Sequence, residues 1–309
     1  MKNLVISVDI GASKLRVALI TKKGIIIKKL ESPMPKNPKN GKEITEKIII
    51  LIEELSSGFK NNSFLGIGIG STGPINLKQG KLVNPTNIAL KEIFLTKPLK
   101  KKFNLPVSLL NDCTCAAWGE KIFGKGKKYR NIFYISISSG IGGGAVIDNN
   151  LLIGKNGNAT EVGHFTIETK YNLPCSCGQG KGHWESCCSG KNLPRFFKQW
   201  ALLNKINNKY NFKKAEEIFR LAKEKTISDF LKEMGNMNIK GILNIIVAYD
   251  PEIIILGGTV FLENKNIIFP YLKQRIKNPP IVVTSLKENA PLLGAAALVF
   301  YPPNSFKRI

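Results

Sequence analysis

Asp9-Ile10-Gly11-Ala12-Ser13-Lys14 lies between two β-branched strands and is one of two glycine-rich turns that decide the fold. The second, Ser138-Ser139-Gly140-Ile141-Gly142-Gly143-Gly144, has the matching place in the second half of the chain. Such turns present backbone N–H groups and hydroxyls that suit phosphate oxygens. Neither contains the Gly-Lys-Ser/Thr run of a Walker loop. Two of them in successive α/β units could close on one nucleotide from opposite sides of a cleft.

The rest of the chain alternates predicted strands with predicted helices. Apolar residues at helical spacing indicate a helix over Lys42–Phe59. β-Branched runs predict strands at Leu4–Asp9, Leu15–Thr21, Ile25–Glu31, Leu65–Gly70, Val107–Leu110, Asn131–Ile137, Gly143–Ile147, Glu252–Leu256 and Ile281–Thr284. Further helices are expected at Cys113–Phe123, within Leu193–Tyr249, at Phe261–Ile276 and at Leu292–Tyr301. The sequence therefore predicts an α/β protein, and its 309 residues suffice for two domains.

The only two histidines of the chain, His164 and His183, bracket a Cys175-Ser176-Cys177 segment. Two thiols and two imidazoles form a ligand set that tetrahedral zinc prefers. The segment that follows is rich in glycine, which lets the chain fold back tightly enough to bring four ligands to one ion. We therefore predict a structural Zn²⁺ held by His164, Cys175, Cys177 and His183.

Composition limits the class of protein. No apolar run approaches the ~20 residues that span a bilayer. The six cysteines stand in three close pairs, which in a long chain without a signal peptide fits reduced thiols and metal better than a disulfide framework. We therefore expect a cytoplasmic protein. The formal net charge of +24 would favour nucleic-acid binding, but the lysines are scattered, and we interpret them as a solvated surface.

Longer motifs resemble the ROK family (repressor, open reading frame, kinase), in the sugar-kinase branch of the actin-like ATPase fold. The first turn resembles the family's first phosphate motif, and Ser138–Gly144 resembles the second, although Ser138-Ser139 replaces the more usual Gly-Thr. Asn111–Glu120 is similar to the catalytic segment, and Ile255–Gly258 to the adenosine motif. Glu161–His164 and the Cys-x-Cys-Gly segment are the most specific signs. The resemblance covers nearly the whole chain.

The sequence departs from the family pattern at the end of the zinc motif. The family usually has a cysteine two residues before a sugar-binding Glu, whereas here His183 stands two before Glu185. The loop from Cys177 is also one residue longer. Histidine preserves zinc chemistry, so the prediction of a zinc site stands, with Cys187 or Cys188 as the alternative fourth ligand.

The resemblance implies ATP-dependent transfer of the γ-phosphoryl group to a sugar hydroxyl, which needs positioning, charge stabilisation and one base. Asp112 is the candidate catalytic base, although an Asp at this place could instead be a helix N-cap. The implied sugar ligands are Asn111, Asp112, Glu161, His164 and Glu185. His164 would serve twice, with one ring nitrogen on zinc and the other toward the sugar. The two glutamates could alternatively be ordinary surface carboxylates.

The resemblance also implies ATP and Mg²⁺ as cofactors. Asp9 would hold Mg²⁺ through water, with an Asx-type turn to Gly11 as its alternative role. The implied nucleotide contacts are Asp9, Gly11, Ser13, Lys14, Ser138, Ser139, Gly140, Gly257 and Gly258.

The implied fold is a two-domain actin-like ATPase (ribonuclease H-like) fold with an inter-domain cleft and a zinc-binding loop. We expect a first domain of residues 1–110, joined by the returning C-terminal helix at about 291–309. The second domain would be residues 111–290, with the zinc loop at 164–185 and a helical insert at 193–249.

The expected activity is phosphorylation of a hexose, glucose above all, at its 6-hydroxyl. N-acetylmannosamine or another amino sugar is the near alternative, because the same hydroxyl ligands serve both. A sugar-responsive DNA-binding regulator is more distant, because the first strand begins at Leu4 and leaves no room before it for a helix-turn-helix. A homo-oligomer (dimer or tetramer) is expected, with no membrane partner and no specific nucleic-acid binding.

Overall fold

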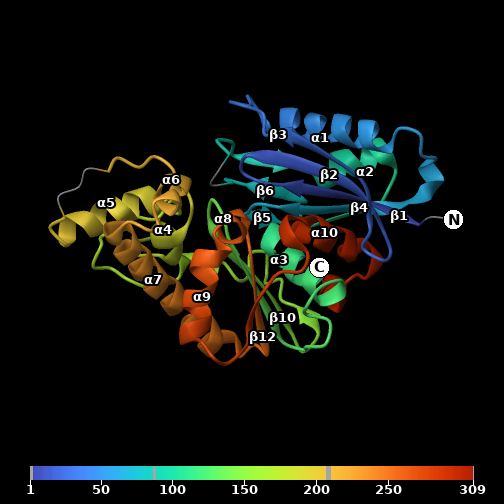
Figure 1. The fold of residues 1–309 in the computed structure, drawn as a ribbon. Helices are drawn as coiled ribbons and strands as arrows, with labels where there is room; N and C mark the ends of the chain where they lie inside the picture. Colours follow the sequence, from blue (N-terminus) through green and yellow to red (C-terminus); the bar gives the residue numbers. More distant parts are fainter. Residues whose placement is uncertain (1–2, 86–87, 207–209, 309) are drawn as a thin grey trace. The chain divides into compact units, whose positions relative to one another are not determined.

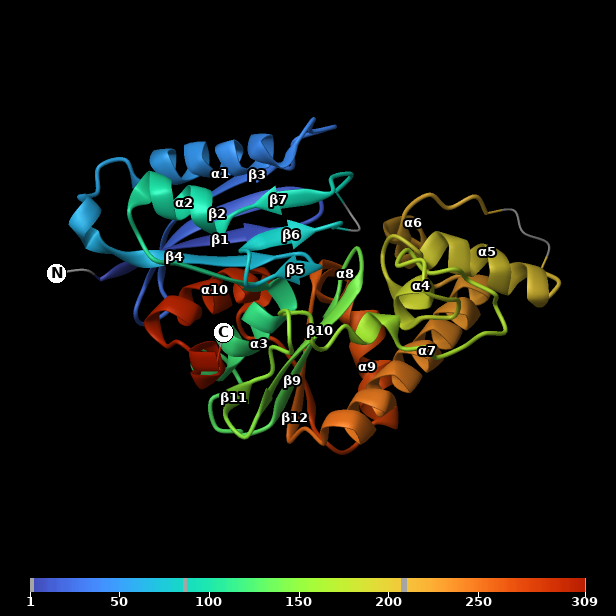
Figure 2. The same ribbon diagram turned by 180° about the vertical axis from the view of Figure 1, so that it is seen from behind.

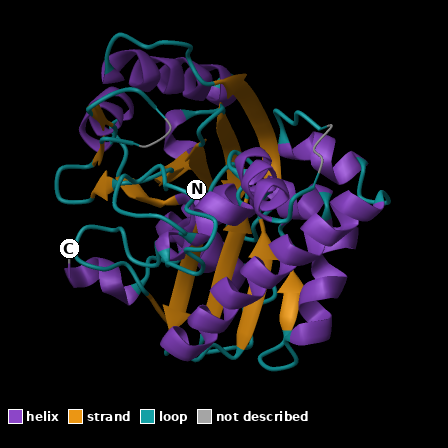
Figure 3. Cartoon of the chain, turned by 90° about the vertical axis from the view of Figure 1, so that its left-hand side faces the viewer, coloured by secondary structure: helices purple, strands orange, loops and turns teal. Residues whose placement is uncertain are grey.

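The computed structural model describes residues 3–85, 88–206 and 210–308. Helices and strands are mixed along the whole chain (Figure 3), which confirms the predicted α/β class. Residues 207–209 of the predicted helical insert, and residues 1, 2, 86, 87 and 309 of the predicted first domain, lie outside the described residues. The chain forms two compact units. Unit 1 comprises Met1–Tyr134, Gly144–Thr160 and Thr284–Ile309, and unit 2 comprises Ile135–Gly143 and Glu161–Val283.

Unit 1 is built on a five-stranded sheet with the order β3-β2-β1-β4-β8. Its strands are β1 (Leu4–Ile10), β2 (Lys14–Thr21), β3 (Ile26–Pro33), β4 (Phe64–Ser71) and β8 (Val107–Asn111). The first three pair antiparallel, whereas β4 is parallel to both β1 and β8. The register aligns Asp9 with Gly70 and Ser71 with Asn111. The carboxyl ends of β1, β4 and β8 therefore meet at one edge of the sheet.

Helices cover both faces of this sheet (Figure 1). Alternate residues of a strand point to opposite faces, so Val8 packs in one core with Ile48 of α1 (Gly41–Ser56), while Val5 packs in another with Leu292 of α10 (Ala290–Phe300). The hydroxyl of Ser7, on the α10 face, donates to the Leu292 carbonyl oxygen at 2.6 Å. Helix α2 (Thr96–Phe103) contacts α1, and α3 (Asp112–Ile122) contacts α10.

Helix α3 falls within unit 1, whereas the predicted division assigned it to the second domain. The physical reason is its close packing on α10, where a Cβ added at Gly119 would lie 2.8 Å from the Gly294 nitrogen. Unit 1 also contains a small antiparallel sheet that the sequence did not predict. Its strands are β5 (Ile75–Asn76), β6 (Lys81–Val83) and β7 (Glu92–Phe94).

A second five-stranded sheet has the order β11-β10-β9-β12-β13. Its strands are β9 (Ile132–Ile137), β10 (Ile141–Ile147), β11 (Asn150–Leu151), β12 (Ile253–Gly257) and β13 (Ile281–Val283). The boundary between the two units falls within β9 and β10. The second glycine-rich turn joins these two strands, so its residues 138–140 belong to unit 2.

Unit 2 is mostly helical outside this sheet. Its helices are α4 (Trp184–Cys188), α5 (Leu193–Leu203), α6 (Ala215–Arg220), α7 (Lys225–Tyr249), α8 (Thr259–Glu263) and α9 (Lys265–Arg275). Helix α4 packs against both α5 and α7 (Figure 2). The indole of Trp184 is fully buried there and donates to the Asn238 amide oxygen at 2.8 Å. The helix predicted over 261–276 is divided, because Asn264 ends α8 and begins α9.

Single 3₁₀ turns complete the described elements: η1 (Asn61–Ser63), η2 (Val162–His164), η3 (Lys287–Asn289) and η4 (Asn304–Arg308). In the part of the chain that the structure describes, none of the helices has both the length and the apolarity needed to cross a bilayer.

Candidate functional site

The four predicted zinc ligands lie together in unit 2. One donor atom from each of His164, Cys175, Cys177 and His183 can be chosen so that all four lie within 4.8 Å of one another. The loop closes through a short backbone ladder, in which Cys175 N donates to Gly180 O at 2.9 Å. A second bridge pairs Thr166 with His183. The sequence between the histidines therefore folds back on itself and brings its two ends together.

The donor geometry fits a single zinc ion. Each histidine presents Nδ1 to a thiol, at 3.4 Å for His164 with Cys175 and 3.4 Å for His183 with Cys177. Zn–S bonds of about 2.3 Å and Zn–N bonds of about 2.0–2.1 Å place neighbouring tetrahedral ligands roughly 3.5 Å apart. Burial lowers the pKa of His183 and so favours the neutral imidazole that binds metal.

The alternative ligands, Cys187 and Cys188, are not among the four clustered donors. Both are buried in α4, and burial raises the pKa of Cys187 to about 12. The Cys188 thiol lies 3.6 Å from the Met234 carbonyl oxygen, to which it donates. Because a thiol binds zinc as the thiolate, these surroundings favour His183 as the fourth ligand.

Replacement of His183 tests this ligand set. Purified protein should contain about one zinc per chain, since a structural site is closed by four protein ligands. His183→Ala should lose most of that zinc on dialysis against a mild chelator and unfold at a lower temperature, while Cys187→Ala should retain its zinc. Elemental analysis and thermal unfolding measure both outcomes. Full zinc retention in His183→Ala would instead favour a cysteine of α4.

The predicted sugar ligands of unit 2 lie in or beside the Cys/His loop at 164–185, which is called the metal loop from here on. Glu161 immediately precedes η2, which carries His164 at its end. Partial desolvation raises the pKa of the Glu161 carboxyl. The nearby charge of His164 lowers that pKa, and the charge of Glu185 raises it. The residue as a whole is exposed to solvent. The Glu185 carboxylate accepts from Ser176 Oγ at 2.9 Å and from Ile141 N at 3.0 Å. Three predicted sugar ligands are thus neighbours in the same unit.

The second glycine-rich turn and the predicted adenosine motif also meet in unit 2. Gly258 follows β12 with φ of +89°, and a Cβ there would lie 2.4 Å from the Ile137 carbonyl oxygen. Glycine is therefore required by both its backbone conformation and this close approach. Ser138 O, one residue further along, accepts from Gly190 N at 2.8 Å. The turn at 138–140 consequently lies between Gly258 and the segment that follows α4.

In unit 1 the buried carboxylate of Asp9 is paired with a residue that the sequence analysis did not single out. Arg16 contacts Asp9 Oδ2 through Nε and through Nη2, both at 2.7 Å, and the two residues are 6% and 4% exposed. Nη1 of Arg16 donates to the Glu288 carbonyl oxygen at 2.8 Å. Burial raises the pKa of Asp9, and the Arg16 charge opposes that rise. Asp9 therefore binds Arg16, and the Gly11 N–H donates instead to Lys14 O at 3.0 Å.

Asn111 and Asp112 stand at the carboxyl end of β8, where α3 begins. Asn111 is the N-cap of α3, because its side-chain oxygen accepts from Cys113 N at 2.9 Å and from Thr114 N at 3.2 Å. Asp112 is the first helical residue, and its Oδ1 accepts from Cys113 N at 2.7 Å. The capping role considered for Asp112 thus belongs to its neighbour. Burial raises the pKa of the Cys115 thiol, and the nearby charges of Asp112 and Asp9 add to that rise.

The exposed Ser13 lies in the first turn, and Lys14 begins β2. The Lys14 ammonium lies 3.3 Å from the Glu31 carboxylate on the neighbouring strand, in a half-exposed ion pair. Such pairs are weak, so Glu31 does little to fix the position of the Lys14 ammonium.

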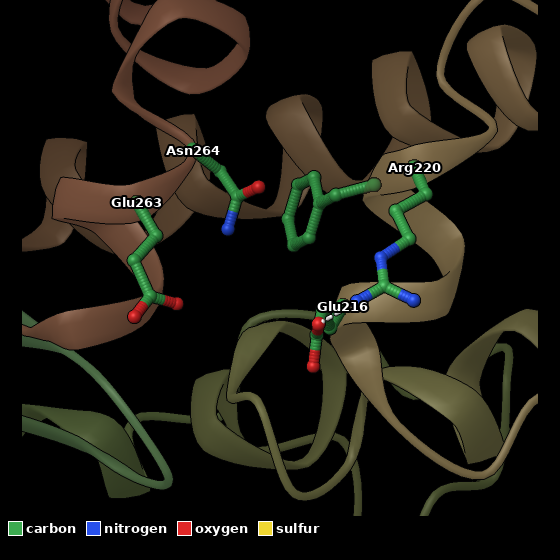
Figure 4. Close-up of a pocket in the computed structure, with 5 residues that line it drawn as sticks. Glu216, Arg220, Glu263 and Asn264 are labelled. Atoms are coloured by element: carbon green, nitrogen blue, oxygen red, sulfur yellow. Dashed lines mark hydrogen bonds and ion pairs between the residues drawn. The ribbon is translucent and has the colours of Figure 1, made fainter.

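Unit 2 contains a cavity of about 360 Å³ that the sequence did not indicate (Figure 4). Glu216 and Arg220 of α6 lie on one side of it, and Glu263 and Asn264, at the junction of α8 and α9, lie on the other. Phe219, which is 6% exposed, completes its lining. The Asn264 side chain donates from Nδ2 to Val260 O at 2.9 Å. The volume is in the range of small-molecule pockets.

Known proteins similar to this chain belong to the family that the motifs resemble. A model of the ROK family matches residues 5–301. A glucokinase of Pyrobaculum calidifontis is 33% identical over 311 residues, covering 98% of this chain and 97% of that protein. A xylose repressor of Bacillus subtilis is 30% identical over 313 residues, covering 95% of this chain and 76% of the repressor. The crystal structure of a ROK family glucokinase from Streptomyces griseus in complex with glucose and AMPPNP has a TM-score of 0.78 and 27% identity, covering 96% and 98% of the two chains.

Such coverage, with the motifs in their expected order, defines an α/β member of a known family. The chain belongs to the ROK family.

Proposed function

We propose that this protein is an ATP-dependent hexose kinase that phosphorylates glucose at its 6-hydroxyl. The observation that carries the proposal is the gathering of Glu161, His164 and Glu185 beside a Cys/His metal loop. Near-complete coverage of a glucokinase at 33% identity supports the same activity. The finer fold assignment, an actin-like pair of domains that closes a cleft on its substrates, is part of this proposal. So is a cytoplasmic location, which the reduced cysteines support.

The proposal assigns the proton transfer to Asp112. Its carboxylate takes the proton of the sugar 6-hydroxyl as that oxygen attacks the γ-phosphorus of ATP, so that a phosphate ester and ADP are formed. Asn111 would contact the sugar through its amide nitrogen, because its side-chain oxygen caps α3. The carboxylates of Glu161 and Glu185 accept from other sugar hydroxyls, and a site built on such hydrogen bonds rejects analogues that lack them.

The residues around the first turn fit a nucleotide with Mg²⁺. Asp9 Oδ2 is taken by Arg16, so Oδ1 is the oxygen left to hold a water of the ion. When bound, Mg²⁺ supplies charge stabilisation to the phosphates. Gly11, Ser13 and Lys14 in unit 1 and Ser138, Ser139 and Gly140 in unit 2 would contact phosphates, with Gly257 and Gly258 beside the nucleoside. In the metal loop, a zinc ion would fix the ring of His164 through Nδ1.

The cavity between α6 and the α8–α9 junction would receive the base of the nucleotide. Asn264 Oδ1 can accept from an exocyclic amine, since the side chain is oriented by its Nδ2 bond to Val260 O. Loss of one such hydrogen bond costs about 0.5–1.5 kcal/mol. Asn264→Ala should therefore raise the KM for ATP by roughly 3–10-fold and leave the KM for the sugar within about 2-fold.

Asn204→Ala is the matched control. Asn204 also ends a helix, α5, and its Nδ2 donates to Trp200 O at 2.8 Å, so its replacement removes the same kind of helix-end bond away from the cavity. Steady-state kinetics with varied ATP should separate the two variants. Equal ATP KM values for both would contradict the assignment of the base to this cavity.

A coupled assay over a panel of sugars tests substrate and donor together. Glucose, mannose, fructose, N-acetylglucosamine and N-acetylmannosamine are each offered with ATP, ADP or polyphosphate. The proposal expects the highest kcat/KM for glucose with ATP. A preference for N-acetylmannosamine would retain the kinase and change its substrate, whereas turnover with no sugar under any donor would contradict the proposed function.

A further inference from the structure

We infer that Ser176 is a positioning residue for the sugar. Its hydroxyl holds the Glu185 carboxylate in the orientation that receives a sugar hydroxyl. This inference rests on the proposed function. The carboxylate is held at both oxygens. Oε1 accepts from Ser176 Oγ at 2.9 Å, and Oε2 accepts from the Ile141 N–H at 3.0 Å. All three residues belong to unit 2. The carboxylate therefore joins the metal loop to the second glycine-rich turn.

The metal loop determines where Ser176 lies in space. The residue lies between Cys175 and Cys177, two of the four clustered donors, so an ion held by both cysteines would restrain the backbone on either side of Ser176. The Gly178 N–H donates to Cys175 O at 3.1 Å and tightens the same turn. Ser176 itself is exposed, so its hydroxyl can be removed without opening a cavity in the core.

The second restraint depends on Gly140. A Cβ at this position would lie 2.5 Å from Glu185 Oε2, which is far inside contact distance. Absence of a side chain at Gly140 thus lets the carboxylate reach the Ile141 N–H. Because Ile141 belongs to the second glycine-rich turn, Glu185 is hydrogen-bonded both to that turn and to the loop that carries Ser176.

The Ser176 hydroxyl restricts the orientation of the Glu185 carboxylate. A carboxylate has about four acceptor positions, so after accepting from Ser176 and Ile141 it can still accept from a sugar. The last torsion of a glutamate is broad, and without the Ser176 bond the carboxylate samples orientations that do not face the sugar. Binding must then restrict that motion, at a cost to affinity. The loss acts on binding, so it should raise the sugar KM more than it lowers kcat.

Three variants test the inference in the metal-loaded enzyme. Ser176→Ala removes the hydroxyl, Ser176→Thr keeps it, and Ser57→Ala removes an exposed hydroxyl in unit 1 outside the candidate site. We expect Ser176→Ala to raise the glucose KM by about 5–10-fold, which is within the range for loss of one typical hydrogen bond. The ATP KM, the kcat and the zinc content should stay within about 2-fold of the wild type. Ser176→Thr and Ser57→Ala should both resemble the wild type.

A panel of deoxyglucoses separates positioning from a general structural effect. One analogue lacks the hydroxyl that Glu185 accepts from, and for that analogue the ratio of KM values between Ser176→Ala and wild type should fall to about 1. A ratio that stays the same for every analogue, a Thr variant as impaired as the Ala variant, or loss of zinc from Ser176→Ala would overturn the inference. An active wild type with an unaffected Ser176→Ala contradicts only this inference, whereas a wild type that phosphorylates no sugar contradicts the proposed function as well.

Discussion

Asp112→Asn should reduce kcat by roughly 10²–10⁴-fold, the contribution of a positioned general base. Asparagine keeps the size and hydrogen-bonding reach of the carboxylate but cannot take a proton at neutral pH. The sugar and ATP affinities should therefore stay within a few-fold, as measured by calorimetry on the inactive variant. The substitution leaves the helix cap intact, because Asn111 is the N-cap of α3.

A matched control is Asp148→Asn, which removes one carboxylate of unit 1 from an exposed ion pair with Arg130. An exposed pair contributes little to stability, so this variant should keep the wild-type kcat. If Asp112→Asn retained more than about a tenth of the wild-type rate, Asp112 would not be the base. The proposed proton transfer would then need another acceptor.

Arg16→Met should lower the free energy of unfolding by about 3–5 kcal/mol, the cost of leaving one member of a buried ion pair without its partner. The Asp9 carboxylate is buried at the end of β1, and Arg16 of the neighbouring strand β2 is its charged partner there. Folded proteins are stable by only about 5–15 kcal/mol, so this single change should be visible in urea denaturation. Asp9→Asn/Arg16→Met should recover part of the loss, because it removes the unpaired charge.

The same pair gives a pH dependence. Burial raises the pKa of Asp9 above its ordinary value, and removal of Arg16 takes away an opposing charge. A carboxyl whose folded pKa is raised contributes stability that is lost as pH rises through that pKa. The destabilisation of Arg16→Met should therefore be smaller at pH 5 than at pH 8. Equal unfolding curves for Arg16→Met and wild type, or a double variant less stable than the single one, would contradict this account of the pair.

Elements with strong periodicity were predictable from the sequence. The strands β1, β2 and β4 and the helix α1 follow runs of β-branched or helically spaced apolar residues, and the zinc loop follows ligand identity and spacing. The strands β5, β6 and β7 were missed because two or three residues show no period. Helix α2 was missed because its lysines leave it with Leu99 as its only buried residue.

Pairings between side chains were harder to predict. Asp9 and Arg16 face each other across β1 and β2, and a hairpin register counted outward from the first turn would have placed these opposite charges together. The Asn111 cap had a signal too, since Asn caps helices as well as Asp does. The bond from Ser176 to Glu185 and the cavity at Asn264 had none, because each depends on how loops and helices fold in space.

The most direct test of the central claim is ³¹P nuclear magnetic resonance of purified protein with glucose, ATP and Mg²⁺. Transfer to the 6-hydroxyl forms a phosphate monoester on a methylene carbon, whose two protons split its phosphorus resonance into a triplet. We predict growth of that triplet at the same rate as loss of the ATP γ-phosphate resonance. Growth of inorganic phosphate alone, or an unchanged ATP spectrum with zinc-loaded protein, would contradict a hexose 6-kinase.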